Sequence, residues 1–459
     1  MMYTSLKFIV FSVAILMGYY VLPYKFRSFF VLAANFYFCS LFGMKHLFVL
    51  IASTLLSFLC AKLLQKNKSK SVLIVGVSAI AVSLFLVKFG SAFGMNSILV
   101  PIGYSFYTLQ MISFLVDIYH GKIIEFDLIS FSQYMTFFPI LLQGPICRYQ
   151  KMQGEFKKEI SFDFQMIKSG ALLMAFGIFK KLVIADRLAI YTSDVFTNYT
   201  DKSGGVILVA VLFYAFQLYT DFSGCTDISR GVSYCLGISL PVNFNNPYFS
   251  LSIKEFWNRW HISLSSWLKD YVYIPLGGNR KGTVRKYINL FLTFLVSGLW
   301  HGTGLQYLIW GGMQAFGQVL EGYFEKWFKW YKKLDHLLVQ IIRRSFVSVF
   351  TLGSWLMFRA HGVRAALLMA IKIVTGFFSF SGILECGLDR YDLVLSFVLI
   401  AGLLIVDLIR EKKKDIRQRL NSSPYVVQCL IFMILIFGVL VFGIYGSGYD
   451  ASDFIYMQF

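Results

Sequence analysis

The sequence predicts an all-α, polytopic membrane protein, and its composition and its pattern both support this fold class. Of its 459 residues, 57% are hydrophobic and only 15% are charged, against roughly 25% charged in an ordinary soluble domain. Apolar stretches long enough to cross a hydrocarbon core of about 30 Å recur along the chain. No repeat at a fixed period is visible, which argues against a solenoid or a barrel. We therefore expect about 11 to 13 membrane segments, re-entrant helices included, in a single membrane domain covering residues 1–459.

The expected membrane helices begin near the N-terminus, where Lys7 precedes an apolar run. No small-x-small cleavage site precedes Pro23, so we interpret this run as a retained helix rather than a signal peptide. Residues 129–146 are apolar but contain Pro139 and Pro145, which predicts a broken or re-entrant segment. The expected spans are 6–22, 28–43, 46–64, 71–88, 100–119, 166–184, 204–222, 286–300, 304–323, 341–358, 391–409 and 425–445.

The charge balance is strongly basic, with 43 Lys and Arg against 24 Asp and Glu and a formal net charge of +19. Cytoplasmic loops of membrane proteins collect Lys and Arg, and no nucleic-acid-binding module accompanies the charge. Cytoplasmic placement of the basic clusters puts Met1 and Phe459 outside and lays 364–379 flat on the outer surface. The clusters are Lys66 to Lys70, Arg148 to Lys158, Arg280 to Lys286, Lys326 to Lys333 and Arg410 to Arg419.

The stretch 222–286 departs from the apolar pattern, because it is rich in Gly, Ser, Asn, Arg and Trp. A polar, aromatic segment of this kind in a membrane protein usually lines a cavity or a surface site. Beyond it, His301 follows an apolar run directly and is framed by Gly298, Gly302 and Gly304. Because an ionisable residue at membrane depth usually has a function, we interpret His301 as a functional residue. The alternative is a structural histidine at a helix end.

A second histidine lies in a tryptophan-rich segment of this polar stretch. Written as one helix, the segment places Trp257, His261 and Ser265 on one face and lets Glu255 pair with Arg259. A tryptophan belt at the membrane interface accounts for the tryptophans alone but not for the polar groups among them.

Other catalytic arrangements are absent from the sequence. It has no GxSxG, HExxH, P-loop or GxGxxG motif. The seven cysteines form no CxxC pair, and no carboxylate or cysteine joins the histidines at ligand spacing. We expect neither a metal site nor a permanently bound cofactor.

Several motifs together resemble the membrane-bound O-acyltransferase (MBOAT) family, and within it the bacterial alginate/peptidoglycan O-acetyltransferase branch. They are DFSGCTD at 221–227, NFNNPY at 243–248, FWNRWH at 256–261, YVYIPLGGNR at 271–280 and GLWHG at 298–302. Weaker matches are PIGYSFY at 101–107, FFP at 137–139, FKKLVIADR at 179–187 and FIYMQF at 454–459. One departure is Cys225, where this branch usually has Tyr.

The resemblance implies a helical disc with a thin centre pierced by a tunnel, lined by the core motif region 100–310. His301 would lie deep inside, the acyl donor would arrive from the cytoplasm, and the acceptor hydroxyl would approach from outside. The implied donor is acetyl-CoA, used as a substrate, and the implied acceptor is an extracytoplasmic polysaccharide. Such proteins usually work with an extracytoplasmic SGNH-type acetyltransferase partner. A multi-pass protein of the cell membrane, embedded in the lipid bilayer and without nucleic-acid partners, is expected.

We predict a separate role for each residue of the candidate site. His301 is the expected general base. His261 is a second catalytic residue, which either supports the groups that contact the substrate or lies on the donor side. Asp227 either orients a histidine or pairs with Arg230. The cations Arg280, Lys281 and Arg285 suit the phosphates of coenzyme A by charge; the alternative is that they only set topology. Further orienting residues are Trp300 and Asn279.

Two other functions compete with acetyl transfer. One is D-alanyl transfer to teichoic acid from a carrier-protein thioester. The other is a polytopic transporter or flippase, which would more naturally show paired broken helices in two related halves. No such internal symmetry is visible in the sequence.

Overall fold

The computed structural model describes residues 2–90, 100–327, 336–413, 419–420 and 422–446, and these residues form helices joined by turns, with no strand among them. Six of the described helices are long and apolar enough to cross a membrane: α3, α4, α11, α17, α19 and α21. The predicted all-α, polytopic fold class is thereby confirmed. The motif at 454–459 and parts of the last two basic clusters lie outside the described residues.

The described chain divides into two compact units, which alternate along the sequence within the expected single domain. Unit 1 contains residues 2–178 and 224–242, and unit 2 contains residues 179–223 and the described residues of 243–446.

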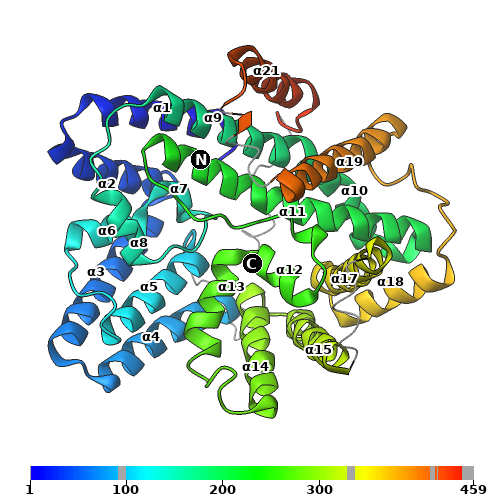
Figure 1. Cartoon of the computed structure of the whole chain (residues 1–459), viewed down its shortest axis with the longest axis horizontal. Helices are drawn as coiled ribbons and strands as arrows, with labels where there is room; N and C mark the ends of the chain where they lie inside the picture. The colour runs from blue at the N-terminus through cyan, green and yellow to red at the C-terminus, as the bar shows by residue number, and fades with distance from the viewer. Residues whose placement is uncertain (1, 91–99, 328–335, 414–418, 421, 447–459) are drawn as a thin grey trace. The chain divides into compact units, whose positions relative to one another are not determined.

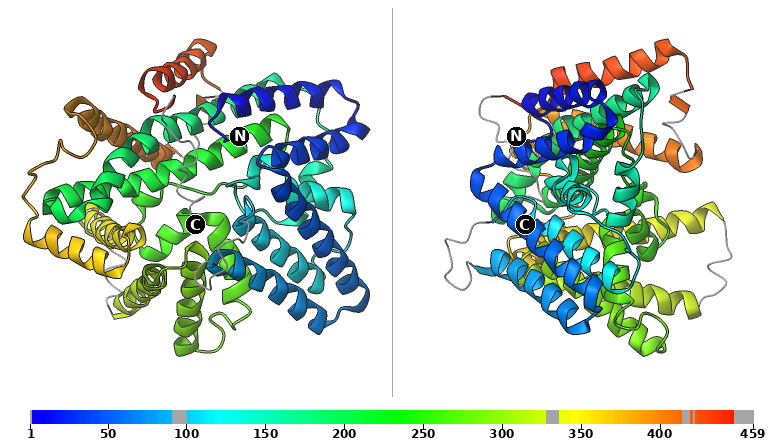
Figure 2. Two further views of the ribbon diagram at one scale, coloured as in Figure 1. Left: turned by 180° about the vertical axis from the view of Figure 1, so that it is seen from behind. Right: turned by 90° about the vertical axis from the view of Figure 1, so that its left-hand side faces the viewer.

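Unit 1 consists of helices, and local sequence signals mark where several of them begin and end. The Ser5 hydroxyl accepts a hydrogen bond from the Phe8 amide at 3.2 Å and caps the first helix, which ends just before Pro23. Helices α3, α4 and α5 pack side by side (Figure 2). The helices are α1 (Leu6–Val21), α2 (Tyr24–Ser40), α3 (Met44–Asn67), α4 (Lys70–Phe89), α5 (Tyr104–Tyr119), α6 (Leu128–Thr136), α7 (Phe138–Leu141), α8 (Tyr149–Phe156) and α9 (Phe164–Phe179).

The segment that was predicted to be broken is broken, between α6 and α7 and again after Leu141. Buried side chains satisfy the backbone groups that the break releases. The Tyr3 hydroxyl donates to the Phe138 carbonyl at 3.0 Å and accepts from the Leu142 amide at 3.1 Å. Asn35 accepts from the Phe138 amide at 3.0 Å.

Unit 2 contains both candidate histidines: His301 on the long helix α14 and His261 between the short helices α12 and α13. Helices α14 and α15 lie side by side, as do α15 and α17 (Figure 1). The elements are η2 (Lys180–Ala185), α10 (Asp186–Thr197), η3 (Tyr199–Asp201), α11 (Gly204–Cys235, ending in unit 1), η4 (Pro247–Phe249), α12 (Ile253–Arg259), α13 (Ile262–Leu268), η5 (Lys269–Tyr273), α14 (Thr283–His301), α15 (Leu305–Trp327), α17 (Leu337–Arg359), α18 (Val363–Thr375), α19 (Arg390–Lys413) and α21 (Tyr425–Phe442).

Helix α11 extends well beyond its predicted end near residue 222 and runs through the first part of the polar stretch. Its small polar side chains bond back to carbonyls of the same helix, so they do not end it. Thr220 donates to the Phe216 carbonyl at 2.7 Å and Ser229 to the Cys225 carbonyl at 2.9 Å. The first part of the polar stretch, up to Cys235, therefore belongs to this helix.

Candidate active site

The hairpin of α14 and α15 holds His301, which is the last residue of α14. Two glycines bring the helices together at this level. A Cβ at Gly298 would collide with the Tyr307 carbonyl oxygen, and one at Gly311 would collide with the Phe294 carbonyl oxygen. The backbones approach closely at the turn of helix that carries the histidine, which fixes its position.

His301 lies inside a cluster of aromatic rings and is only 2% exposed. Its ring centroid is 4.9 Å from that of Trp300, 5.2 Å from that of Trp310 and 5.3 Å from that of Phe358, each in an edge-to-face arrangement. These rings exclude water and restrict the orientation of the imidazole. Within this unit, His301 therefore occupies an interior, apolar position rather than the surface of a helix end.

His261 does not lie on a continuous helix, so the prediction of one face shared with Trp257 and Ser265 is wrong. Helix α12 ends at Arg259 and α13 begins at Ile262. Between them His261 has φ 44° and ψ 51°, a left-handed conformation that non-glycine residues rarely adopt. Such strain persists only where the surrounding structure imposes it, and it concentrates at functional sites.

Asn243 is the residue that holds His261 in place. Its Oδ1 atom lies 3.3 Å from His261 Nδ1 and also accepts hydrogen bonds from the amide and the hydroxyl of Ser263, at 3.0 and 2.9 Å. Phe222 packs edge-to-face on the imidazole at 4.6 Å. Burial lowers the pKa of His261 to about 3, so this imidazole is neutral at neutral pH.

Trp300 lies between the two histidines. Its ring centroid is 6.2 Å from that of His261 and 4.9 Å from that of His301. Trp300, predicted as an orienting residue, thus contacts two histidines that are forty positions apart in sequence.

Backbone hydrogen bonds join the segment before η4 to the turn that carries His261. The Asn245 amide donates to the Arg259 carbonyl at 2.9 Å, and the Ile262 amide donates to the Asn243 carbonyl at 3.0 Å. Two motifs that are separate in sequence therefore form a single structural element around the histidine.

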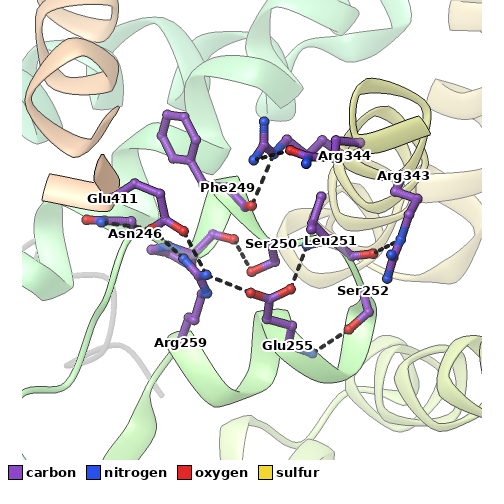
Figure 3. A network of polar contacts seen from close by, with 12 residues as sticks. Asn246, Phe249, Ser250, Leu251, Ser252, Glu255, Arg259, Arg343, Arg344 and Glu411 are labelled. Atoms are coloured by element: carbon purple, nitrogen blue, oxygen red, sulfur yellow. Dashed lines mark hydrogen bonds and ion pairs between the residues drawn. The ribbon is translucent and has the colours of Figure 1, made fainter. Parts of the chain in front are cut away.

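Arg259 connects this element to α19 (Figure 3). Its guanidinium binds both carboxylate oxygens of Glu411, at 2.7 and 2.9 Å, and the predicted partner Glu255 at 2.6 Å. Asn246 also donates to Glu411, at 3.3 Å. We call Asn246, Arg259 and Glu411 the Arg259 clamp.

The cations expected to bind phosphates lie at the opposite end of α14 from His301. Arg280, Lys281 and Arg285 are all exposed, as is Asn279. They surround a glycine turn whose Gly278 carbonyl accepts a hydrogen bond from Asn289 at 2.9 Å. At 1.5 Å of rise per residue, about 24 Å of helix axis separates Arg285 from His301. The structure therefore does not bring these four residues to the imidazole.

Residues 11–359 of the chain match the membrane-bound O-acyltransferase family. The chain belongs to this family. It is 33% identical to a probable alginate O-acetylase AlgI of Pseudomonas fluorescens, over 80% of this chain and 74% of that protein. It is 32% identical to a peptidoglycan O-acetyltransferase of Helicobacter pylori, over 82% of this chain and 79% of that protein. A teichoic acid D-alanyltransferase of Bacillus subtilis is 33% identical over 51% of this chain and 62% of that protein.

This family membership makes the chain an O-acyltransferase and a multi-pass membrane protein. Both histidines lie within the matched residues, which end at Arg359. The resemblance based on scattered motifs is thereby confirmed.

In this acyltransferase, Asp227 pairs with Arg230 at 3.1 Å, the second of its two expected alternatives. The Lys181 ammonium lies 2.6 Å from carboxylate oxygens of both Asp186 and Asp221, and all three side chains are at most 4% exposed. One ammonium therefore pairs with two carboxylates inside the protein. All three residues lie in the matched motifs FKKLVIADR and DFSGCTD, but nothing in the sequence indicated that they pair.

The residues that sequence reasoning missed are Asn243, Glu411 and Trp310. Asn243 lay within a matched motif, which was the available signal for it. Glu411 is 152 positions from Arg259, and no local pattern connects them. Trp310 lay at the end of the core motif region with no polar neighbour to single it out.

Proposed function

We propose that this acyltransferase takes an acetyl group from cytoplasmic acetyl-CoA for O-acetylation of an extracytoplasmic polysaccharide, with His301 as the general base. The observation that carries the proposal is the position of His301, buried among three aromatic rings at the end of α14. An imidazole in such a site can take a proton from a hydroxyl without competition from bulk water.

The two histidines suit different tasks. His301 ends α14 inside the aromatic cluster, whereas the left-handed turn that carries His261 holds its Nδ1 atom 3.3 Å from Asn243 Oδ1. His261 instead suits a supporting role on the donor side, with its ring orientation set by Asn243 and Trp300.

The acyl donor is proposed to bind with its phosphates at the basic turn and its thioester end at His301. Arg280, Lys281 and Arg285 are exposed and so accessible to phosphates. About 24 Å of helix axis separates Arg285 from His301. This distance suits an extended donor whose charged end stays at the membrane surface. Asn279 belongs to the same turn and is proposed to assist there rather than at the imidazole.

Acetyl transfer is favoured over D-alanyl transfer by the extent of the similarity. The O-acetylating relatives match 80% and 82% of the chain, whereas the D-alanyltransferase matches 51%. By analogy with these relatives, the acceptor is alginate, peptidoglycan or another exopolysaccharide, reached through an SGNH-type partner protein. The protein is proposed to reside in the cell membrane with its basic loops in the cytoplasm.

The test is acetyl transfer from radiolabelled acetyl-CoA by the purified protein in lipid vesicles, with His301→Ala beside the wild type. Loss of a general base is expected to reduce the rate by about 10²- to 10⁴-fold without loss of folding. His46→Ala is the matched control, because His46 lies in unit 1. Near-normal transfer by a folded His301→Ala protein would refute the base assignment. Transfer from a D-alanyl carrier protein but not from acetyl-CoA would refute the donor assignment.

A further inference from the structure

Trp310 is a buried tryptophan of α15 that packs directly against His301. It is 1% exposed. Its ring lies 5.2 Å from that of His301, at an interplanar angle of 87°. Phe358, Trp257 and Trp355 complete its surroundings, at 5.1, 5.8 and 6.1 Å between ring centroids. All of these contacts are made by ring faces and edges.

The indole N–H of Trp310 has no acceptor among the residues that the structure describes. A buried tryptophan N–H usually finds a hydrogen-bond partner, and leaving one unpaired destabilises a protein. The neighbouring Trp257 follows the usual pattern, because its N–H donates to Gln314 at 3.1 Å. The N–H of Trp355, stacked on Trp310, also has no acceptor among the described residues, but Trp355 has no ring contact with His301 among those that the structure gives for this imidazole.

The position of this unpaired donor is fixed by close helix packing. Gly311 follows Trp310 directly, and its close approach to α14 allows no side chain there. Gly298, three residues before His301, makes the reciprocal approach to α15. The donor and the imidazole are therefore placed on two backbones that cannot separate or slide easily. Preorganised donors of this kind are what a developing negative charge requires.

We propose that Trp310 is a catalytic residue whose indole N–H donates a hydrogen bond to the carbonyl oxygen of the acyl thioester. This inference rests on the proposed function, since it assumes that the thioester reaches His301. The acyl donor would supply the acceptor that the protein lacks at this position.

The acceptor hydroxyl oxygen attacks the thioester carbonyl carbon, the C–O bond forms, and the hydroxyl proton passes to the His301 imidazole. The carbonyl π pair moves onto the oxygen, where the Trp310 N–H stabilises the negative charge. The intermediate then collapses, the C=O bond reforms and the C–S bond breaks. The thiolate leaves and takes the proton from the imidazolium, which regenerates the neutral histidine.

The decisive experiment replaces Trp310 by β-(3-benzothienyl)alanine, an isostere of tryptophan with sulfur in place of the N–H. Loss of one oxyanion donor typically lowers kcat by about 10²- to 10³-fold, and we expect that range with the KM for acetyl-CoA changed by less than about twofold. Because an unpaired donor is removed, the thermal unfolding midpoint should stay or rise. Trp310→Phe should lower kcat similarly, with some loss of packing.

The same replacement at Trp257 is the matched control. It leaves Gln314 without its donor, so the unfolding midpoint should fall while kcat changes by less than about twofold. A folded Trp310 isostere with kcat within about threefold of wild type would overturn the inference, and if His301→Ala were inactive the proposed function would stand. Retained transfer by His301→Ala would overturn the base assignment and this inference together.

Discussion

Substitution of Glu411 by Gln tests whether the Arg259 clamp holds the His261 turn in place. Glutamine keeps the size and one acceptor oxygen of glutamate but removes the charge and the second acceptor. Arg259 would keep at most one hydrogen bond to α19, now to a neutral amide oxygen, and its contact to Glu255. Since Arg259 is two residues before His261, the perturbation acts directly on the turn that carries the strained histidine.

The expected magnitude follows from burial and geometry. The Arg259 and Glu411 side chains are 18% and 27% exposed, so solvent screens the pair only in part. A hydrogen bond to a charged group contributes about 1.5–3 kcal/mol net, and the partial exposure places the total loss near the same range rather than at twice that value. The helical pair of Arg259 with Glu255, spaced i to i+4, should contribute only about 0.3–0.5 kcal/mol.

Thermal unfolding in detergent, followed by tryptophan fluorescence, measures the effect. For a unit of this size, 1 kcal/mol corresponds to about 2–4 °C, so Glu411→Gln should lower the midpoint by about 3–12 °C. The matched control Glu255→Gln should lower it by less than about 2 °C. Arg259→Gln combined with Glu411→Gln should cost less than the sum of the single changes. Equal effects at Glu255 and Glu411, or strict additivity, would refute the role of the clamp.

Two further predictions concern charges elsewhere in the chain. Arg280→Ala with Lys281→Ala should raise the KM for acetyl-CoA more than it lowers kcat, because phosphate contacts are similar in the ground and transition states; an unchanged KM at low salt would show that these cations only set topology. At the end of α10, burial opposes ionisation of Asp194, but hydrogen bonds from Lys202 and Asn198 outweigh it and lower the pKa of this carboxyl. Its ionic contribution to stability is therefore present above about pH 3.8 and lost as the pH falls through the folded pKa. The stability difference between wild type and Asp194→Asn, measured by thermal unfolding at several pH values, should shrink below pH ~4, and a difference independent of pH would contradict this.

The fold could be predicted because its determinants are local. The length of an apolar run and its flanking breakers set where a membrane helix begins and ends, and α14 and α19 lie within a few residues of their predicted spans. Prediction was less accurate where side chains satisfy the backbone in unexpected ways. The polar end of α11 illustrates this, because the Ser229 hydroxyl bonds back to the Cys225 carbonyl and is satisfied within the helix.

The candidate site could be predicted only in part, for a different reason. His301 stands out because an apolar run and glycines frame it, which is a local signal. The left-handed conformation of His261 is imposed by contacts with Asn243 and by the pairing of two separate segments. A single residue with positive φ has no periodic signature, so the helical pattern around it was misleading.

The aromatic cluster explains why residues so far apart in sequence act together. Trp300 contacts both histidines, and Trp310 and Phe358 enclose the second from α15 and α17. A tryptophan belt at a membrane interface would spread these rings along the surface, whereas here they are at most 8% exposed. Rings buried around one imidazole cannot serve as interfacial anchors. Their burial therefore favours a role at the reaction centre, and it makes the unpaired N–H of Trp310 a feature that packing alone does not explain.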